Sequence, residues 1–434
     1  MLLALPGVGV ASQSLPQPAE PPISLPAHLS LDDAVRLFRE RGFDLLLADA
    51  VVASAEGELK IAKAFPNPQV GGGGGHTWTY NPNHCEESGC SQTPWNASLS
   101  DQGLLVDLLV GKRRLKVDVA KAALEAARLS RADAERTLVA LVRQQYAQTV
   151  LAGSTLGFAR EVAKSAAETS RLVDLRFHAG DVSEADSARA ATQKLEAEQA
   201  VDGAAQAFAA SKAALAFLLG GRDGHADFDI DPQLPPARSG PLASANVDSL
   251  LAEARAKRPD LAAADAQLRS SDAALSLARR QRVPDVALVA NYQQEGHGQE
   301  AIQPPTATFG VSLPLPLFDQ NQGEIAKADA AVRSATLQRA KLDAQVASDV
   351  ASALAAYQSA AARVQRMESG LLDRSRRARD LVEYQYKRGA ASLLELLDAQ
   401  RTFVATNAEY YQDMGDYWTA FYQLEAAVGA ELSP

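Results

Sequence analysis

The side chains best suited to bind a metal or to form a covalent bond gather in one short segment. The chain has two cysteines and six histidines, and the segment NPNHCEESGC contains Cys85 and Cys90. If the chain is exported to an oxidising compartment, these two thiols can form a disulfide. Together with His76 and His84 they could instead bind a soft metal ion. We favour the disulfide, and we expect neither a resident metal nor a cofactor.

Carboxylates form the second group that could do chemistry. Glu395 and Asp398 are three positions apart, so a helix places both on one face. Asp186 lies six positions after Gly180, as Glu395 lies six positions after Gly389. These carboxylates could act on cations together, or they could form an ordinary solvated face near a helix N-terminus, where negative charge is favourable. No nucleophile–base pair or phosphate-binding glycine loop accompanies them, so we do not expect an enzyme.

The composition excludes several classes of protein. Of the 434 residues, 47% are hydrophobic and 22% are charged, which is typical neither of a disordered chain nor of a bundle of membrane-spanning helices. The 53 acidic residues exceed the 43 basic ones, giving a net charge of -10, so a nucleic-acid partner is not expected. No apolar run approaches the roughly 20 residues that a transmembrane helix needs.

Proline positions indicate where long helices lie. No proline occurs within 95–231 or within 317–433. Because proline inside a helix costs about 3 kcal/mol, such tracts, rich in Ala, Leu, Glu, Gln and Arg, are typical of long helices. The tract from Gly111 to Arg176 alone would form a helix about 100 Å long. A helix of that length suits a coiled coil or a helical tube.

Prolines and glycines cluster instead in two segments, 66–94 and 284–316, each with two strand-like stretches around a polar loop. The predicted strands cover about 69–80, 95–106, 284–292 and 306–317. Apolar residues alternate along the last two, which gives a strand one apolar face. Stretches of about 9–12 residues match tilted strands that cross a membrane, and a soluble hairpin is the alternative.

The sequence indicates an internal duplication. Gly180 and Gly220 are 40 positions apart, as are Gly389 and Gly429, and the offset between the pairs is 209. Each half follows the order helix, strand, loop, strand, long helix, tight turn, long helix. The predicted domains are a signal-like or disordered segment 1–28, a first repeat 29–220 with its hairpin at about 111–220, a Pro/Gly-rich linker 221–246, a second repeat 247–429 with its hairpin at about 320–429, and a tail 430–434.

Four strands per chain cannot complete a membrane-spanning sheet. Such a sheet cannot leave its edges unpaired in lipid, and four strands are too few to close a barrel. The chain would therefore assemble with copies of itself. Three copies, each with four strands, would give a 12-stranded barrel and a tube of helices.

The motifs and their order resemble those of the TolC-type outer membrane factors, also called outer membrane efflux proteins. The resemblance covers nearly all of 29–429. It is carried by Ala64-Phe65-Pro66-Asn67-Pro68 before a strand, by Pro316-Leu317-Phe318-Asp319 with Gly323 before a long helix, by Phe177-His178-Ala179-Gly180-Asp181-Val182-Ser183 at one helical turn, and by Tyr386-Lys387-Arg388-Gly389 with Ser392-Leu393-Leu394-Glu395-Leu396-Leu397-Asp398-Ala399 at the other.

The resemblance implies a mostly α-helical protein with a transmembrane β-barrel portion. By family, the chain would be a homotrimer in the outer membrane of a Gram-negative bacterium, with a long periplasmic tunnel. Its partners would be a periplasmic adaptor (membrane fusion) protein, an inner-membrane pump of the resistance-nodulation-division type, and outer membrane lipid. The cargo would be heavy-metal cations, as in the cobalt–zinc–cadmium branch, or drugs. A type I secretion duct and a soluble coiled-coil scaffold are the alternatives.

The resemblance also suggests roles for particular residues. Gly180 and Gly389, with Ser183 and Ser392, would form hairpin turns that dock the adaptor. A second set would form the channel entrance: Asp186, Glu395, Asp398 and Tyr386. The family's arginine two positions after the second glycine is replaced here by Ala391, so any bond that closes this entrance must be chemically different.

Overall fold

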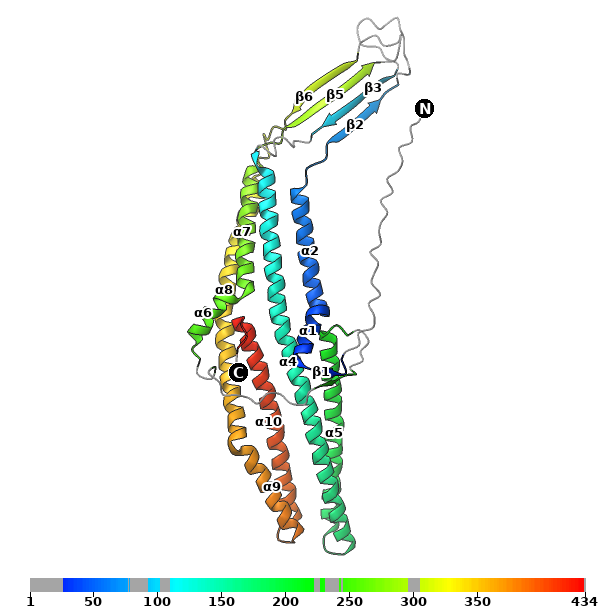
Figure 1. Ribbon diagram of the computed structural model, residues 1–434, viewed down its shortest axis with the longest axis vertical. Coiled ribbons are helices and arrows are strands. Elements are labelled where there is room, and N and C mark those ends of the chain that lie inside the picture. Colours follow the sequence, from blue (N-terminus) through cyan, green and yellow to red (C-terminus); the bar gives the residue numbers. More distant parts are fainter. Residues whose placement is uncertain are drawn as a thin grey trace. The chain divides into compact units, whose positions relative to one another are not determined.

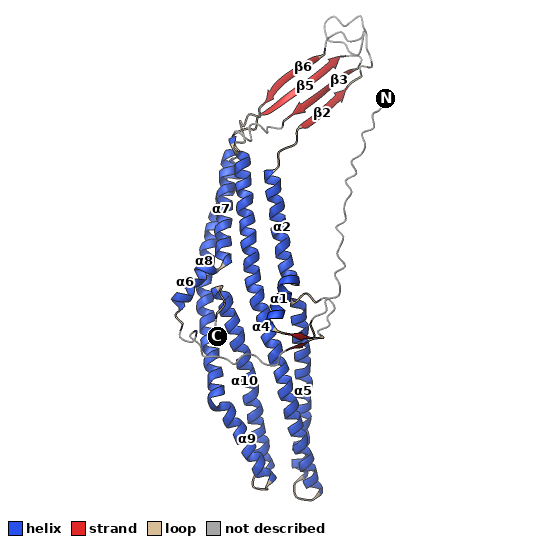
Figure 2. Ribbon diagram, viewed as in Figure 1, coloured by secondary structure: helices blue, strands red, loops and turns tan. Residues whose placement is uncertain are grey.

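Long helices dominate the computed structural model, which describes residues 26–76, 78, 93–101, 110–221, 227–230, 242, 245–295 and 305–432 (Figure 1 and Figure 2). The prediction of a mostly helical chain is confirmed. The described residues form two compact units: unit 1 lies within 1–42, 142–236 and 374–411, and unit 2 lies within 43–141, 237–373 and 412–434.

Two helical hairpins make up most of unit 1. Its elements are β1 (His28–Leu29), α1 (Leu31–Arg41), the second part of α4 (Lys112–His178), α5 (Glu184–Leu218), β4 (Asp229–Ile230), most of α9 (Leu372–Lys387) and the first part of α10 (Leu393–Val428). Ser30 caps α1 by accepting a hydrogen bond from the Asp33 backbone N–H at 3.1 Å. β1 and β4 pair in parallel, a contact that the sequence pattern did not indicate.

Unit 2 combines helices with a sheet. Its elements are α2 (Phe43–Lys63), β2 (Gln69–Gly74), β3 (Pro94–Ser100), the first part of α4, α6 (Val247–Lys257), α7 (Pro259–Arg280), β5 (Ala287–Glu295), β6 (Thr306–Ser312), α8 (Gln322–Arg366), a π-helical turn (Met367–Leu371) and the last part of α10. Pro259 opens α7, because proline fits the first position of a helix but not its interior. The core includes a buried pair, Tyr357 of α8 and Tyr417 of α10, whose ring centroids are 5.5 Å apart.

The sheet of unit 2 is antiparallel, with the strand order β2-β3-β5-β6. Its central strands, β3 and β5, come from segments of the chain almost 190 residues apart, and the register aligns Ala97 with Tyr292. Among the described residues, β2 and β6 each pair along one side only. The backbone groups on their other sides are therefore available to further strands.

The register gives the sheet one apolar face and one polar face, because successive side chains of a strand point to opposite sides. The mainly apolar face carries Val70, Trp95, Ala97, Leu99, Leu288, Ala290, Tyr292, Ala307, Phe309 and Val311, with Gln294 as its polar member. The mainly polar face carries Gln69, Asn96, Ser98, Ser100, Asn291, Gln293, Thr306, Thr308 and Ser312, with Ala287 and Val289 among them. Phe309 is 86% exposed and Val70 is 77% exposed, so within the described part of the chain the apolar face is open there.

The glycine run of β2 fits the polar face. A Cβ on Gly71 would lie 2.6 Å from Ser98 Oγ, and one on Gly73 would lie 2.7 Å from Asn96 Oδ1. Glycine at these two positions therefore leaves room for the polar side chains of the neighbouring strand.

Three of the four strands of the sheet are shorter than the sequence predicts, and β5 has the predicted length but begins and ends three residues later. β2 ends at Gly74 rather than near Tyr80, while β3 ends at Ser100, with residues 102–106 outside the described part. β5 begins at Ala287 instead of Pro284, and β6 ends at Ser312 instead of Leu317. Proline explains the last two differences, because Pro284, Pro314 and Pro316 have no N–H to donate to a strand ladder.

The helices also differ from the prediction in detail. The second hairpin is interrupted by the π-helical turn at Met367–Leu371, so its first arm is divided into α8 and α9. In the described part of the chain, every helix is too short or too polar to serve as a membrane span.

Candidate functional site

Two helical turns lie at the same end of unit 1, one between α4 and α5 and the other between α9 and α10 (Figure 1). Both turns are built in the same way. Gly180 has a φ of 84° and Gly389 a φ of 78°, a left-handed conformation that favours glycine. At each turn the glycine N–H and the next N–H donate back to the last helical carbonyls, at 2.9–3.0 Å. This hydrogen-bond pattern, known as the Schellman motif, ends each helix close to its glycine.

The helices that leave the turns both begin with a serine cap, which at α10 is completed to a capping box. At α5 the Ser183 hydroxyl accepts from the Asp186 N–H at 3.2 Å and donates to the Asp186 carboxylate at 2.8 Å. At α10 Ser392 Oγ accepts from the Glu395 N–H at 3.3 Å, and the Ser392 N–H donates to Glu395 Oε2 at 2.7 Å. Glu395 is thus part of a capping box, and Asp186 supports the Ser183 cap through the serine hydroxyl.

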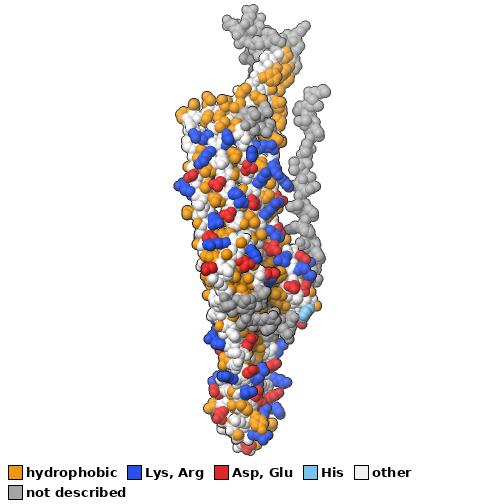
Figure 3. Space-filling view, turned by 60° about the vertical axis from the view of Figure 1, so that its left-hand side comes forward, with side chains coloured by type: hydrophobic (Ala, Val, Ile, Leu, Met, Phe, Trp, Pro, Cys, Tyr) orange, Lys and Arg blue, Asp and Glu red, His pale blue; other side chains and the backbone are white. Residues whose placement is uncertain are grey.

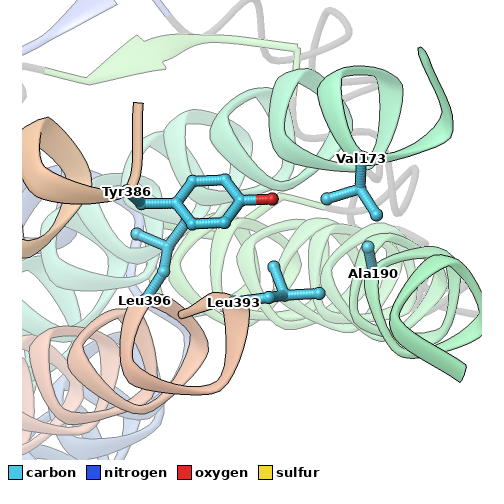
Figure 4. Close-up of a cluster of buried hydrophobic side chains, with 5 residues drawn as sticks. All are labelled: Val173, Ala190, Tyr386, Leu393 and Leu396. Carbon is cyan, nitrogen blue, oxygen red and sulfur yellow. The ribbon is translucent and has the colours of Figure 1, made fainter. Parts of the chain in front are cut away.

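A buried cluster joins the two hairpins just behind the turns. It consists of Val173 of α4, Ala190 of α5, Tyr386 of α9, and Leu393 and Leu396 of α10. Figure 4 shows the Tyr386 ring beside Leu396, with its hydroxyl directed toward Val173. Because side chains from all four helices interdigitate here, the position of one turn is linked to that of the other within unit 1.

Arg176 makes a contact between the hairpins that the sequence did not reveal. Its guanidinium carbon lies 4.8 Å from the centre of the Tyr386 ring, in a cation–π arrangement. The same side chain donates to the Lys387 carbonyl at 3.4 Å. Arg176 stands at the end of α4, so it offers its charge to the end of α9. The position of Arg176, four residues before Gly180, indicates that it lies at the end of a helix. No local pattern in the sequence predicts that its partner is Tyr386, 210 positions away.

Tyr386 itself is 3% exposed, and its hydroxyl has no hydrogen-bond partner among the described residues. A buried hydroxyl without a partner costs about 1–3 kcal/mol. The aromatic ring, rather than the hydroxyl, is therefore what stabilises this part of the single chain.

The carboxylates near the turns have different surroundings. Hydrogen bonds from the Ser392 backbone N–H, and then from its hydroxyl, lower the pKa of Glu395. Asp186 forms an ion pair with Arg189 at 3.3 Å. Asp398 is exposed and makes no side-chain hydrogen bond or ion pair within the described part of the chain. Asp398 is therefore the carboxylate of this group that is most available to a mobile cation.

The structure thus gathers the predicted turn and entrance residues at one end of unit 1. The predicted disulfide is different, because Cys85 and Cys90 lie outside the described residues. In the described part, no group of three or more His, Cys, Asp or Glu side chains could hold a metal ion.

A profile of the outer membrane efflux protein family matches this chain twice, over residues 34–221 and 250–430. The chain belongs to this family. The matched segments contain both hairpins and all four strands of the sheet, so the outer membrane efflux protein assignment covers the elements described above.

Two curated relatives align along most of the chain. The cobalt-zinc-cadmium resistance protein CzcC of Cupriavidus metallidurans is 24% identical over 409 residues, which cover 92% of this chain and 90% of that protein. The pyoverdine export outer membrane protein OpmQ of Pseudomonas putida is 25% identical over 388 residues, covering 86% of this chain and 80% of that protein.

The fold is also that of a solved channel. The CmeC outer membrane channel of Campylobacter jejuni superimposes with a TM-score of 0.78 at 18% identity, covering 92% of this chain and 85% of the other. At this identity the likeness shows the fold alone.

Proposed function

We propose that the protein is a trimeric outer membrane channel, the passive exit duct of a tripartite efflux system. In this proposal the sheet of unit 2 lies in the outer membrane of a Gram-negative bacterium. The helices extend into the periplasm, where they meet an adaptor protein and, through it, an inner-membrane pump. The channel has no catalytic step of its own. Family membership supports the efflux role, and the architecture of the sheet supports the assembly.

The observation that carries the proposal is the two-faced, open sheet. One face is mainly apolar and exposed, and the other is mainly polar, as expected where one side faces lipid and the other a water-filled lumen. Its edge strands, β2 and β6, each lack a partner on one side among the described residues. Lipid does not tolerate unpaired backbone groups, so the edges must meet those of other copies. With four strands each, three copies give the proposed 12-stranded barrel.

The proposed duplication is supported by three independent features. The family profile matches the chain in two successive segments. Both helical turns use the same glycine geometry and the same serine cap, with an offset of 209 between Ser183 and Ser392. The two central strands of the sheet come one from each half.

We further propose that the turns at Gly180 and Gly389 dock the adaptor and that the nearby carboxylates line the channel entrance. A docking site needs a fixed shape, and the Schellman turns and serine caps provide one. In a trimer, the channel axis would be surrounded by three copies each of Asp186, Glu395 and Asp398. A ring of like charges attracts cations and repels itself, so other contacts must hold the entrance closed. The Arg176–Tyr386 contact is our candidate for one of them.

For the cargo we propose heavy-metal cations. The support is the likeness to the CzcC protein, whose name places it in cobalt, zinc and cadmium resistance. Drugs and siderophores are the competing cargoes, since OpmQ is named for pyoverdine export. A deletion strain compared with its parent for growth in zinc, cobalt and a panel of antibiotics distinguishes them. Lost metal tolerance with unchanged antibiotic tolerance supports the proposal, and the reverse pattern contradicts it.

Membrane fractionation tests the channel proposal itself. The protein should sediment with the outer membrane and run on gels as a trimer that dissociates on heating. A soluble coiled-coil scaffold would instead stay in the soluble fraction and show no heat-sensitive assembly. In that case the exposed face of the sheet would need another explanation.

A further inference from the structure

Basic residues surround the helix ends that adjoin the sheet in unit 2. They come from the end of α2, the start of α4, and the end of α7 with the residues after it. We call this set the basic collar: Lys60, Lys63, Lys112, Arg113, Arg114, Lys116, Arg279, Arg280 and Arg282. The acidic residues that accompany it include Asp285 and Asp319, with Glu324 and Asp329 at the start of α8. The collar is therefore strongly positive, although the whole chain is acidic.

Printed contacts bring these segments together. Arg113 donates to the Lys63 carbonyl and stacks on Phe65, with 3.7 Å from the guanidinium carbon to the ring centre. Lys112 Nζ donates to the Asp285 carboxylate at 2.6 Å. The amide of Asn321, just before α8, donates to the Ala278 carbonyl of α7 at 2.8 Å. The basic residues thus belong to one continuous surface rather than to separate helices.

Helix stability does not explain the collar. Basic residues at the ends of α2 and α7 interact favourably with the helix dipole. The start of α4 is the opposite case: it carries Lys112, Arg113, Arg114 and Lys116 and has no acidic residue in its first turn. Positive charge at a helix N-terminus is unfavourable. An anion bound from outside the chain would offset this repulsion.

Several guanidiniums are available to such an anion. Arg114, Arg279 and Arg280 are exposed and make no side-chain hydrogen bond or ion pair within the described part. Arg279 and Arg282 line a hollow of about 530 Å³ together with Phe318, Gln320 and Asp329. The Asp329 carboxylate forms an ion pair with Arg333 at 3.0 Å. Two arginines beside a polar amide suit a phosphate group, which guanidinium binds through two parallel hydrogen bonds.

The hollow lies against an apolar surface. Phe318 is 92% exposed, Leu317 71% and Leu315 69%, and these residues follow β6 directly in the chain. Figure 3 shows hydrophobic side chains on the visible part of the sheet, with Lys and Arg side chains interspersed with Asp and Glu on the helices below it. A ligand that fits both surfaces has a phosphate at one end and hydrocarbon at the other.

We propose that the basic collar binds the headgroups of anionic phospholipids, such as phosphatidylglycerol, whose acyl chains lie along the apolar face of the sheet. The proposal rests on the proposed function, because a sheet inserted in a membrane puts the collar at the level of the headgroups. It adds a ligand class and a site: the hollow at Arg279 and Arg282, with Arg114 as a further contact. Basic residues near an anionic surface each contribute about fivefold in affinity.

Lipid titration of the purified full-length protein tests the proposal. The protein in a nonionic detergent is titrated with phosphatidylglycerol, with phosphatidylcholine and with inorganic phosphate alone, and bound lipid is counted by native mass spectrometry. Phosphatidylglycerol should bind at least about tenfold more tightly than phosphatidylcholine, and its affinity should fall as salt rises. Equal binding of both lipids, or equal competition by phosphate alone, overturns the proposal.

Variants locate the site. The triple variant Arg114→Gln, Arg279→Gln, Arg282→Gln should lose about tenfold or more of the preference for phosphatidylglycerol. Arg366→Gln is the matched control, because Arg366 is exposed and lies at the opposite end of α8, about 65 Å along the helix. The control should bind as the wild type does. A triple variant that retains the full preference contradicts the assignment of the site.

The outcome separates this inference from the proposed function. If the protein inserts into bilayers as a trimer but does not prefer the anionic lipid, the channel proposal stands and the collar proposal fails. If the protein forms no membrane-inserted assembly in any lipid, the channel proposal fails, and the collar proposal, which depends on it, fails too.

Discussion

At the scale of residues, substitutions of Tyr386 distinguish the contribution of its ring packing from that of its hydroxyl. Because its hydroxyl has no partner within the described part of the chain, Tyr386→Phe should leave the thermal unfolding temperature unchanged or raise it slightly. Tyr386→Ala removes the ring from the cluster and should destabilise unit 1 by about 3–5 kcal/mol. Differential scanning calorimetry on both variants makes the comparison. A large loss in Tyr386→Phe would mean that the hydroxyl has a partner in another copy.

The capping box at Ser392 predicts a pH dependence. The pKa of Glu395 is lowered in the folded chain, so its contribution to stability is present above its unfolded pKa, near 4.5, and is lost as the pH falls through the lowered folded value. Glu395→Gln can still accept the Ser392 N–H but does not titrate. The difference in unfolding temperature between wild type and Glu395→Gln should therefore shrink from pH 6 to pH 3. Glu409→Gln, on the exposed side of the same helix, should show no such trend.

The entrance role of the carboxylates has an electrical readout. In planar bilayers, the double variant Glu395→Ala, Asp398→Ala should weaken the block of single-channel current by divalent cations, because it removes six carboxylates from a trimer. Asp202→Ala is the control, about five helical turns beyond Ser183. Unchanged block in the double variant would remove both residues from the pore.

At the scale of elements, the glycine turns differ in what a side chain would meet. A Cβ on Gly389 has no atom within 4 Å, so Gly389→Ala should cost only the left-handed backbone, about 1–2 kcal/mol. A Cβ on Gly220, with a φ of 86°, would lie 2.7 Å from the Arg41 carbonyl oxygen. Gly220→Ala should therefore be clearly more destabilising in chemical or thermal unfolding. Equal losses would contradict this assignment of strain.

Many of the helices and turns could be predicted from local sequence patterns. Long proline-free tracts indicate helices, and the structure has α4 over 67 residues. Glycine after a helix indicates a left-handed turn, and Gly180 and Gly389 both have positive φ. The contact of Arg176 with Tyr386 could not be predicted, because it depends on how two distant hairpins pack. The π-helical turn at Met367–Leu371 does have a local signal, because the pair Ser369-Gly370 is typical of a helix kink, but the absence of proline from this tract predicts one uninterrupted helix.

At the scale of the whole molecule, the sequence predicted the family correctly but not the extent of its strands. Alternating apolar residues indicate that a segment is a strand, but they do not indicate where the strand ends. The end depends on where backbone hydrogen bonding stops, which is determined by prolines such as Pro314 and by the neighbouring strand. The separation of an apolar from a polar face emerges only from the register of all four strands. That separation supports the proposed lipid-facing assembly.

The central claim is that one chain supplies a third of a closed barrel. Native mass spectrometry of the protein released from lipid nanodiscs tests it most directly, because it reports how many chains form the membrane-inserted particle. Our account predicts a particle with three times the mass of the mature chain, formed by β6 of each copy beside β2 of the next. A single chain that stays in water without lipid, with both sheet edges unpaired, would contradict it.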